Sequence, residues 1–472
     1  MMHFLPGIIV LLFSSAGYLS AFRFHKYDKA GYALFFLVLS GFVLRAYTAS
    51  DTYLHNWDER YHALVAKHLM HHFLRPTLYE ESVLSLDYKN WTFNHIWLHK
   101  QPLALWLMAI SLKIFGIHPW AVRIPSVILS TVGIKLMYDI AKYLYDKNTA
   151  FIAAFLFSIH GLIIELGAGR TDTDHVDVIF LFFVLLGLSF SVKYLQTKGS
   201  LYCTVLIGFS IGAAILTKWL PGIVILPIWL ALSYSSFSLR KIMIDLFLVF
   251  LIAALIALPW QIYIFCNFPL EARWEYLYNK RHFFEPLEGH SGNFLYHINS
   301  LRIIYGELIY LPVVWFLYRA ATKRRINDIA VSSLFLIPYI FYSVAATKMP
   351  AYTLIACPAI FIITGEAYYF FQKATSFPKV LRVIAVCLIL LPIRYSFERI
   401  KLFDTSESNE LWNSDIEKFA LSNLNTKRTI IFNCPHYVEM MFKSNCTCYS
   451  ETADKILMDS LVNKRYKVVV LP

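Results

Sequence analysis

Two neighbouring carboxylates and a lysine, placed in one polar stretch between apolar segments, are the residues of this sequence best suited to chemistry. The carboxylates stand in the run Trp57-Asp58-Glu59-Arg60-Tyr61, and the lysine stands in His99-Lys100-Gln101-Pro102. An ionised carboxylate can take a proton from an attacking hydroxyl, and a lysine ammonium binds phosphate as a point charge. We therefore expect Asp58 and Glu59 to act in catalysis, with Tyr61, His99 and Lys100 binding substrate.

Structural interpretations of the same residues remain open. The acidic pair opens a helical stretch over residues 61–70, and the positive end of a helix dipole favours ionised carboxylates there. It also fits a helix cap. Pro102 suits a first helical turn, so Lys100 could simply extend from the membrane boundary to water.

A second polar cluster stands in the run from Gly169 to Val178. Asp174 and Asp177 are three residues apart and share one helix face, with His175 beside them. Carboxylates and imidazole bind Mg²⁺, Mn²⁺ or Zn²⁺, so Asp174, His175 and Asp177 form a candidate divalent-metal site, and Asp174 is also a candidate catalytic group. The alternatives are a cluster that orients a base, a partner for Arg170 and the lysines, or an N-cap at Asp172 or Thr173.

Two further runs contain candidate substrate-binding residues. Glu288 and His290 lie in Glu288-Gly289-His290-Ser291-Gly292, where glycines let backbone approach a ligand closely. Lys348 and Tyr352 lie in Thr347-Lys348-Met349-Pro350-Ala351-Tyr352 at the start of an apolar helix. A solvated turn histidine and a lysine reaching for the membrane surface are the structural alternatives.

The composition identifies the class of protein that must position these residues. Hydrophobic residues make up 58% of the 472 residues and charged residues 16%, with a mean hydropathy of +0.53. This leaves too little polar surface for a soluble chain and predicts a polytopic helical membrane protein. The net charge of +12 does not indicate a nucleic-acid partner. Lys and Arg cluster in short loops between the apolar runs, which is the pattern of basic loops that orient membrane helices.

Apolar runs long enough to span a bilayer recur along the sequence. They cover residues 4–22, 31–49, 120–144, 149–167, 175–195, 201–217, 219–236, 242–265, 296–318, 329–346, 350–371 and 380–396. The first run could be a cleaved signal peptide, since Leu19-Ser20-Ala21 is a small-residue site. Its basic residues follow it rather than precede it, which favours a spanning helix with an outer amino terminus.

The basic loops then predict the topology. From this orientation, Lys and Arg fall in alternate inner loops, and residues 50–119, 168–174, 266–295, 347–349 and 397–472 lie together on the outer side. One condition applies. Residues 101–116 must form a juxtamembrane or re-entrant helix, because an additional crossing would invert every later segment.

The last part of the chain, from about residue 397, becomes polar. Short β-like runs at 430–432 and 468–471 flank a helical stretch near 451–463, which predicts a small α/β domain. Cys434, Cys446 and Cys448 lie there, and an oxidising compartment would permit one disulfide. A metal site on three cysteines lacks a fourth ligand.

The motifs resemble those of a known family, the protein O-mannosyltransferases and lipid A aminoarabinose transferases. These are polytopic C-type glycosyltransferases that use polyprenyl-phosphate sugars. The resemblance spans about residues 31–371. In order, the matching elements are Asp58-Glu59, Lys100-Gln101-Pro102-Leu103, Arg123-Ile124-Pro125-Ser126, Asp174, Leu216-Thr217-Lys218 with Gly222, Pro259-Trp260, Glu288-Gly289-His290 and Lys348-Met349-Pro350-Ala351-Tyr352.

This resemblance implies a fold and a domain plan. The fold is an all-α polytopic membrane protein, the C-type glycosyltransferase fold with about 12 to 13 transmembrane helices, followed by a small C-terminal extracytoplasmic α/β domain. Residues 1–30 form an additional helix and cytoplasmic loop, 31–396 the catalytic core with its outer loop 50–119, and 397–472 the α/β domain.

The resemblance also implies a reaction. A sugar would move from a polyprenyl-phosphate donor to a hydroxyl of a lipid, glycan or protein, as in lipid A modification or protein glycosylation, on the extracytoplasmic face of the plasma membrane. Asp58 would be the general base, with inversion, and Lys100 and Lys348 would neutralise the departing phosphate. Apolar helix faces around residues 200–260 would hold the prenyl chain. A divalent metal ion is the one cofactor that the acidic cluster suggests.

Several departures from the family pattern bear on acceptor and metal. His99 stands where the family often has an acidic residue, and Tyr61 comes one residue early. The cluster of Asp174, His175 and Asp177 is richer than the usual single aspartate.

Two rival classes share this composition. A lipid or glycan transporter or flippase should carry paired charges midway through its helices. Here the acidic clusters lie in outer loops instead. A non-catalytic assembly subunit would need neither a base nor phosphate-binding lysines.

Overall fold

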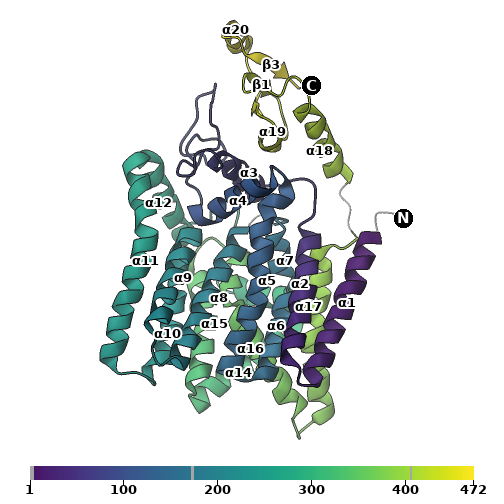
Figure 1. Cartoon of the computed structure of the whole chain (residues 1–472), viewed down its shortest axis with the longest axis vertical. Helices are drawn as coiled ribbons and strands as arrows, with labels where there is room; N and C mark the ends of the chain where they lie inside the picture. Colours follow the sequence, from purple (N-terminus) through teal and green to yellow (C-terminus); the bar gives the residue numbers. More distant parts are fainter. Residues whose placement is uncertain (1–4, 172–174, 404–406, 472) are drawn as a thin grey trace.

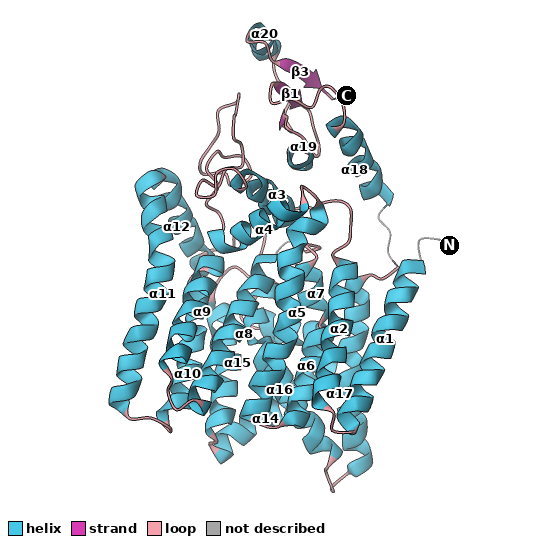
Figure 2. Ribbon diagram, viewed as in Figure 1, coloured by secondary structure: helices cyan, strands magenta, loops and turns pink. Residues whose placement is uncertain are grey.

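Apolar helices run side by side through most of the chain and form a bundle with a small α/β unit at one end (Figures 1 and 2). The computed structural model describes residues 5–171, 175–403 and 407–471. The bundle helices are α1 (Leu5–Lys26), α2 (Ala30–Thr48), α5 (Pro119–Leu144), α6 (Lys147–Ile159), α7 (Gly161–Gly167), α8 (His175–Gln196), α9 (Leu201–Lys218), α10 (Ile225–Tyr234), α11 (Leu239–Asn267), α13 (Tyr296–Tyr305), α14 (Tyr310–Lys323), α15 (Ile326–Val344), α16 (Cys357–Gln372) and α17 (Pro378–Ile400). Short 3₁₀ helices cover Leu220–Val224, Glu307–Ile309 and Pro350–Ala356.

Each predicted apolar run coincides with a helix or with a pair of helices. Within the described residues, nine helices are long and apolar enough to cross a membrane, or ten when α6 and α7, bent by 44° at His160, count as one span. The runs at 219–236 and 296–318 are interrupted, the second at Gly306, whose φ of 101° ends α13. Such breaks are tolerated at membrane depth where protein surrounds them. The predicted polytopic helical fold is confirmed.

The topology depended on α4 (Pro102–Phe115), and this helix does not cross the bundle. Its 14 residues span about 21 Å, less than the roughly 30 Å hydrocarbon core. Figure 1 shows α4 at the upper end, beside α3 (Asp58–Leu69). The helix α12 (Pro269–Phe284) and the α/β unit lie at this same end, so these predicted outer segments are together.

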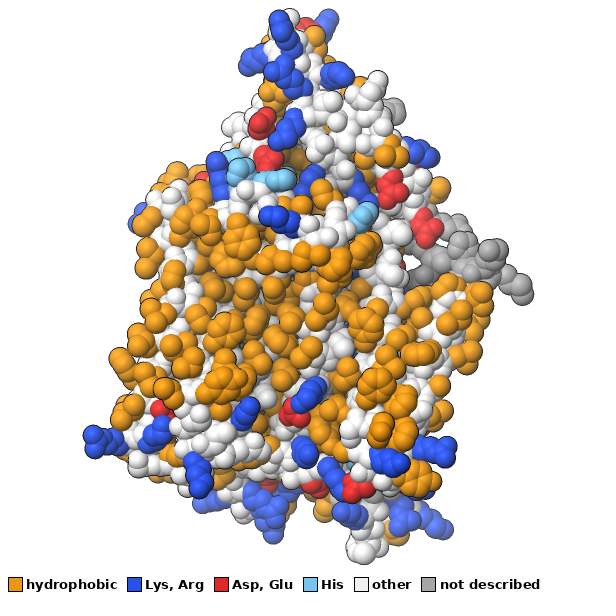
Figure 3. Space-filling view, viewed as in Figure 1, with side chains coloured by type: hydrophobic (Ala, Val, Ile, Leu, Met, Phe, Trp, Pro, Cys, Tyr) orange, Lys and Arg blue, Asp and Glu red, His pale blue; other side chains and the backbone are white. Residues whose placement is uncertain are grey.

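Basic side chains gather at one end of the bundle, the end that the predicted topology places on the inner side (Figure 3). On the face shown in Figure 3, hydrophobic side chains form a broad band across the middle of the molecule, and Lys and Arg gather along its lower edge. The loop at the foot of α1 and α2 is among these basic regions, where Lys147 of α6 pairs with Asp28 at 2.6 Å. The band is the surface that a bilayer would cover.

The C-terminal unit is a small parallel sheet with helices, as predicted. Its strands β1 (Thr429–Phe432), β2 (Thr447–Cys448) and β3 (Lys467–Val470) lie in the order β2-β1-β3, accompanied by α18 (Glu407–Ala420), α19 (Tyr437–Lys443) and α20 (Lys455–Asn463). The central strand β1 is buried throughout. All seven cysteines of the chain fall within the described residues and are free thiols.

The C-terminal unit rests directly on α3. The hydroxyls of Tyr61 and Tyr437 lie 2.9 Å apart, and Arg60 reaches Glu439 at 3.3 Å. The ammonium of Lys67 donates to the carbonyl of Met441 at 2.6 Å. Helix α3 is therefore held between this unit above and the bundle below.

Close packing of α9 against α11 leads to a prediction. A Cβ on Gly212 would lie 2.8 Å from Cβ of Ile256, so Gly212→Val should push the helices apart and destabilise the protein by about 1–3 kcal/mol. Thermal unfolding of the purified protein in detergent measures this. Gly31→Ala is the matched control, because nothing lies within 4 Å of that position. Equal unfolding midpoints for Gly212→Val and wild type would contradict the packing.

Candidate active site

A buried ion pair fixes the start of α3 to the bundle. Arg123 of α5 donates from Nε to Oε1 of Glu59 at 2.6 Å and from Nη2 to Oε2 at 3.0 Å, and both side chains are fully buried. The same guanidinium donates to the backbone carbonyls of Asp51 and Tyr53, each at 2.6 Å. One arginine thus folds the segment after α2 onto α5. Nε2 of His175, at the start of α8, lies 3.2 Å from Oε1 of Glu59.

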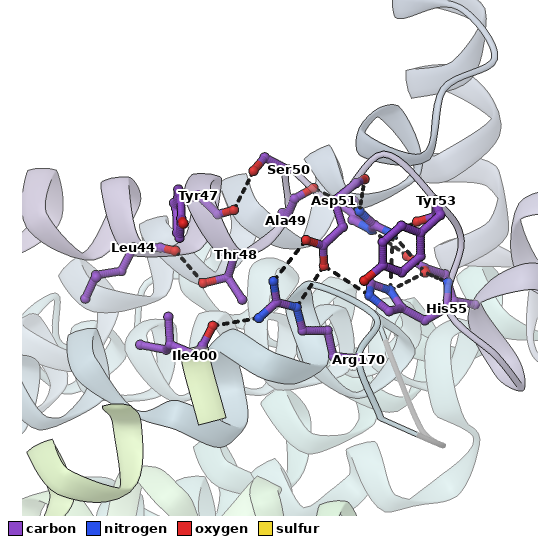
Figure 4. Close-up of polar contacts among 12 residues, drawn as sticks. Leu44, Tyr47, Thr48, Ala49, Ser50, Asp51, Tyr53, His55, Arg170 and Ile400 are labelled. Carbon is purple, nitrogen blue, oxygen red and sulfur yellow. Dashed lines mark hydrogen bonds and ion pairs between the residues drawn. The ribbon is translucent and has the colours of Figure 1, made fainter. Parts of the chain in front are cut away.

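A second arginine extends this network (Figure 4). Arg170 holds the carboxylate of Asp51 through Nε at 2.9 Å and Nη2 at 3.1 Å, and it donates to the carbonyl of Ile400 at 2.6 Å. His55 lies between the two carboxylates, with Nε2 3.1 Å from Asp51 and Nδ1 2.7 Å from Glu59. The loop between α2 and α3 is thereby tied to the end of α17.

The cations of this network keep its carboxylates ionised. Burial by itself raises the pKa of Glu59, but the Arg123 guanidinium and His55 hold it well below its ordinary value. Burial likewise works to raise the pKa of Asp51, and the contacts with His55 and Arg170 lower it to about 2. Both groups therefore act as fixed negative charges at neutral pH.

Next to this network, a cavity of about 800 Å³ lies between α3, α4 and the upper ends of the bundle helices. Asp58 lines it at the first position of α3, and Lys100 lines it just before α4. The ammonium of Lys100 lies 3.1 Å from Oδ2 of Asp58. The predicted base and the predicted phosphate-binding cation are thus direct neighbours, both partly exposed to the cavity.

One side of the cavity is a histidine and carboxylate surface. Oε1 of Glu288 accepts hydrogen bonds from Nε1 of Trp91 at 3.0 Å and from the Tyr278 hydroxyl at 2.7 Å. His99 stacks on Trp91 with ring centroids 4.6 Å apart. Burial works to raise the pKa of Glu288, but the Tyr278 hydroxyl and the Lys100 charge hold it below its ordinary value. Glu288 therefore presents an ionised acceptor to the cavity.

The cavity lining carries a second lysine and aspartate pair. Lys218, the last residue of α9, makes a close ion pair with Asp177 in the first turn of α8, and its ammonium lies 5.0 Å from the ring centroid of Tyr352. All three residues line the cavity. A lysine over an aromatic face gains a cation–π attraction.

Three residues on the cavity wall have unusual backbone. Trp57 (φ 65°, ψ −130°), Trp219 (φ 62°, ψ −156°) and Glu288 (φ 55°) have positive φ without being glycine. The conformations of the two tryptophans are ones that glycine alone adopts readily, at a cost of about 1–3 kcal/mol each. Trp57 precedes Asp58 and Trp219 follows Lys218, so this strain lies next to two charged groups of the cavity.

The structure brings together most of the predicted site residues. Those that line the cavity are Asp58, His99, Lys100, Asp177, Glu288, His290 and Tyr352. Others point elsewhere. Glu59 faces Arg123, Tyr61 faces the C-terminal unit, and the ammonium of Lys348 donates to the carbonyls of Tyr342 and Ser343 at 2.8 and 2.7 Å. Asp174 lies outside the described residues.

The two described residues of the proposed metal site, His175 and Asp177, do not share a partner. His175 contacts Glu59, whereas Asp177 holds Lys218, so the two bind different partners. Across residues 5–171, 175–403 and 407–471, no group of three or more His, Cys, Asp or Glu side chains could hold a metal ion. His175 and Asp177 by themselves therefore do not fit a metal ion.

Several residues of the site had no functional assignment from the sequence. Trp91, Trp219, Lys280 and His282 line the cavity, and Lys218 was noted only as part of a family element. From the range 200–260 expected to hold a prenyl chain, only residues 217–221 reach the cavity. No local signal separates these residues from other interfacial Trp, Lys and His. The position of Lys218 at the end of an apolar run was the available clue.

Comparison with solved structures identifies this architecture. ArnT from Cupriavidus metallidurans superimposes with a TM-score of 0.64 at 14% identity, covering 92% of this chain and 88% of that one. The oligosaccharyltransferase of Archaeoglobus fulgidus, in its apo form, gives a TM-score of 0.64 at 13% identity over 93% of this chain and 69% of that one. The chain has the ArnT fold. The resemblance to C-type glycosyltransferases seen in its motifs is confirmed.

Sequence comparisons agree with the fold. The family model for dolichyl-phosphate-mannose-protein mannosyltransferase matches residues 99–263. An undecaprenyl phosphate-α-4-amino-4-deoxy-L-arabinose arabinosyl transferase of Pseudomonas fluorescens is 25% identical over 67% of the chain and 59% of its own length. One from Proteus mirabilis is 27% identical over 56% and 49%. The chain spans about half the length of these curated relatives.

The buried ion pair gives a stability prediction. Glu59→Gln leaves the Arg123 charge uncompensated and should lower the free energy of unfolding by about 3–5 kcal/mol. Folding lowers the pKa of Glu59. The stability that the Glu59 carboxylate contributes is therefore complete above about pH 4.3, the ordinary pKa of glutamate. It is lost only as the pH falls through the lower pKa of the folded protein. Thermal unfolding in detergent at pH 7 measures the full effect.

The control for this measurement is an exposed ion pair. Lys135 pairs with Asp139 along α5 with side chains 58% and 38% exposed, so Lys135→Ala should change the free energy of unfolding by less than about 1 kcal/mol. Similar losses for Glu59→Gln and Lys135→Ala would show that the buried network does not hold the fold.

Proposed function

We propose that this protein is a membrane glycosyltransferase that moves a sugar from a polyprenyl-phosphate donor to a hydroxyl acceptor. The observation that carries the proposal is the contact of Asp58 with Lys100 in one large cavity at the end of the bundle. A base next to a cation matches a reaction in which a hydroxyl loses a proton while a phosphate leaves. The named relatives transfer aminoarabinose from undecaprenyl phosphate, and one ArnT structure contains undecaprenyl phosphate.

In this reaction Asp58 is the general base. Its carboxylate takes the proton of the acceptor hydroxyl as that oxygen forms a bond to the anomeric carbon of the sugar. The bond from this carbon to the phosphate oxygen breaks, and its electron pair leaves with the polyprenyl phosphate. Attack from the face opposite the leaving group inverts the configuration. Glu59 acts as a positioning residue, because Arg123 and His175 fix its side chain and thereby the first turn of α3.

Lys100 neutralises the negative charge that develops on the phosphate. Its ammonium pairs with Asp58, so an arriving phosphate would exchange one anionic partner of Lys100 for another while Asp58 turns to the acceptor. The cavity shields this charge from bulk water, which strengthens the electrostatic interaction. Glu288, His99 and His290 line the same space and are available to the sugar hydroxyls.

The arrangement in the membrane supports an extracytoplasmic site in the plasma membrane. The cavity lies at the end of the bundle that carries α3, α4 and the C-terminal unit, opposite the edge along which Lys and Arg gather in Figure 3. Basic loops favour the cytoplasmic side. The sugar acceptor is then a lipid, glycan or protein hydroxyl of the cell envelope.

Removing the base is the direct test of the function. Purified protein in nanodiscs is incubated with radiolabelled polyprenyl-phosphate sugars and a bacterial lipid extract, and transfer of label to acceptor is measured. Asp58→Asn should reduce the rate by about 10²- to 10⁴-fold. Asp87→Asn, in the same outer loop but exposed, should transfer as the wild type does. Undiminished transfer by Asp58→Asn would eliminate the base assignment.

The phosphate-binding role of Lys100 leads to a separate prediction. Lys100→Gln should weaken binding of the donor lipid by about 10- to 100-fold, because a hydrogen bond to a charged group is lost. Lys113→Gln is the matched control, since Lys113 lies on α4 with its side chain exposed and away from the cavity. Competition binding with tritiated undecaprenyl phosphate measures both variants. Equal affinities for Lys100→Gln and Lys113→Gln would remove Lys100 from the phosphate site.

A further inference from the structure

Tyr61 connects the catalytic helix α3 to the C-terminal unit. The sequence predicted that this residue binds substrate, but its side chain is buried and its hydroxyl lies 2.9 Å from the hydroxyl of Tyr437, the first residue of α19. Figure 1 shows α19 next to α3. Tyr61 follows the carboxylates of α3 by only two residues, so a contact of the C-terminal unit reaches close to the candidate active site.

The other side of Tyr61 contacts a segment of the cavity wall. Its ring packs edge-on against Trp91, with ring centroids 5.0 Å apart and an interplanar angle of 70°. The Tyr437 hydroxyl also lies 3.4 Å from the backbone carbonyl oxygen of Thr92. Trp91 and Thr92 both line the cavity. The C-terminal unit therefore contacts this part of the wall both directly and through Tyr61.

Trp91 joins two separate segments of the wall. Its Nε1 donates to Oε1 of Glu288 at 3.0 Å, and its ring stacks on His99 at an angle of 6° with centroids 4.6 Å apart. Glu288 comes from the loop between α12 and α13, and His99 comes from the segment before α4. A displacement of Trp91 would therefore move two cavity groups at once.

The contact between the two tyrosines is fixed by a cation. The guanidinium of Arg60 lies 5.1 Å from the ring centroid of Tyr61 and 6.0 Å from that of Tyr437, and it pairs with Glu439 of α19 at 3.3 Å. An arginine over an aromatic face gains a cation–π attraction. These contacts hold both rings in one arrangement, so the connection can set the position of Trp91.

Tyr449 makes a comparable contact that does not reach the cavity. Its hydroxyl lies 3.0 Å from Oγ of Ser82 and accepts a hydrogen bond from the backbone N–H of Val83 at 2.9 Å. In the described part of the chain, the cavity lining includes Trp91 but neither Ser82 nor Val83. Tyr449 thus attaches the outer loop to the C-terminal unit away from the wall.

We propose that Tyr437 is a positioning residue for the sugar of the donor lipid. It acts through Tyr61 and Trp91. Trp91 in turn holds His99 and Glu288 where they meet the sugar hydroxyls. This inference rests on the proposed function, which supplies the sugar lipid. It gives the C-terminal unit a part in substrate recognition, although no described residue of that unit lines the cavity.

The test uses Tyr437→Phe, which keeps the ring and removes the hydroxyl. Transfer by full-length protein in nanodiscs is measured with increasing amounts of the radiolabelled polyprenyl-phosphate sugar that the wild type transfers. We expect KM for this lipid to rise about 3- to 10-fold, the loss typical of a neutral hydrogen bond, with kcat nearly unchanged. Binding of tritiated undecaprenyl phosphate, which has no sugar, should match the wild type because Lys100 still holds the phosphate.

A double-mutant cycle tests whether Tyr437 acts through Trp91. Trp91→Phe removes the donor to Glu288 and should also raise KM for the sugar lipid. If the two residues form one connection, the double variant should raise KM no further than Trp91→Phe does, because contacting residues give non-additive effects. Independent effects, in which the two separate rises multiply, would overturn the inference.

Tyr449→Phe is the matched control, because it removes a hydroxyl from the same unit at a contact with the same outer loop. It should lower the thermal unfolding midpoint about as much as Tyr437→Phe does, and it should keep the wild-type KM. An equal rise of KM in both variants, or a wild-type KM in folded Tyr437→Phe, would contradict the positioning role. If the wild-type protein transfers no polyprenyl-phosphate sugar, the proposed function itself fails, so the two failures are distinguishable.

Discussion

The ion pair between Arg123 and Glu59 is the constraint on which the rest of the site depends. Both charges are fully buried, and neither could remain there alone, because an unpaired charge in the interior costs several kcal/mol. The guanidinium donates to the segment between α2 and α3 as well as to the carboxylate, and His175 brings the start of α8 to the same point. The polar loop therefore has to fold down onto the bundle. Asp58, the residue before Glu59, is left at the mouth of the cavity.

The cavity combines charged pairs that are distant in sequence. Asp58 meets Lys100, and Asp177 meets Lys218, so these two cavity lysines each have a carboxylate partner. Pairing keeps the charges stable inside a partly apolar wall, and each pair can exchange a partner when an anionic ligand arrives. The position of α4 makes this possible. Because this helix lies along the upper end of the bundle instead of crossing it, α3, α8, α9 and α12 all contribute to one site.

Much of the fold and part of the site could be predicted from the sequence. The apolar runs, the basic loops and the short strands each report a local property, and the structure confirms the helices, the position of residues 101–116 and the small parallel sheet. Within the site, the residue types indicated which side chains could act, but the sequence did not indicate which way each side chain points. Asp58 and Glu59 look equivalent in the sequence, yet adjacent residues on a helix point about 100° apart, since 3.6 residues make one turn. One therefore faces the cavity and the other faces Arg123. Similarly, Lys348 and Lys218 both stand at helix ends, and only Lys218 lines the cavity.

By itself the sequence determined that this chain contains many apolar helices long enough to cross a membrane, which segments lie at the same end of the bundle, and which polar residues were candidates for the site. These follow from hydrophobicity and charge, which act over short stretches of chain. Tertiary structure alone decided which carboxylate reaches the cavity, which lysines accompany it, and that His175 and Asp177 separate toward different partners. The backbone strain at Trp57 and Trp219 also appears only in the folded chain. Such features depend on contacts between helices far apart in sequence, where burial forces each charge to find its counter-charge.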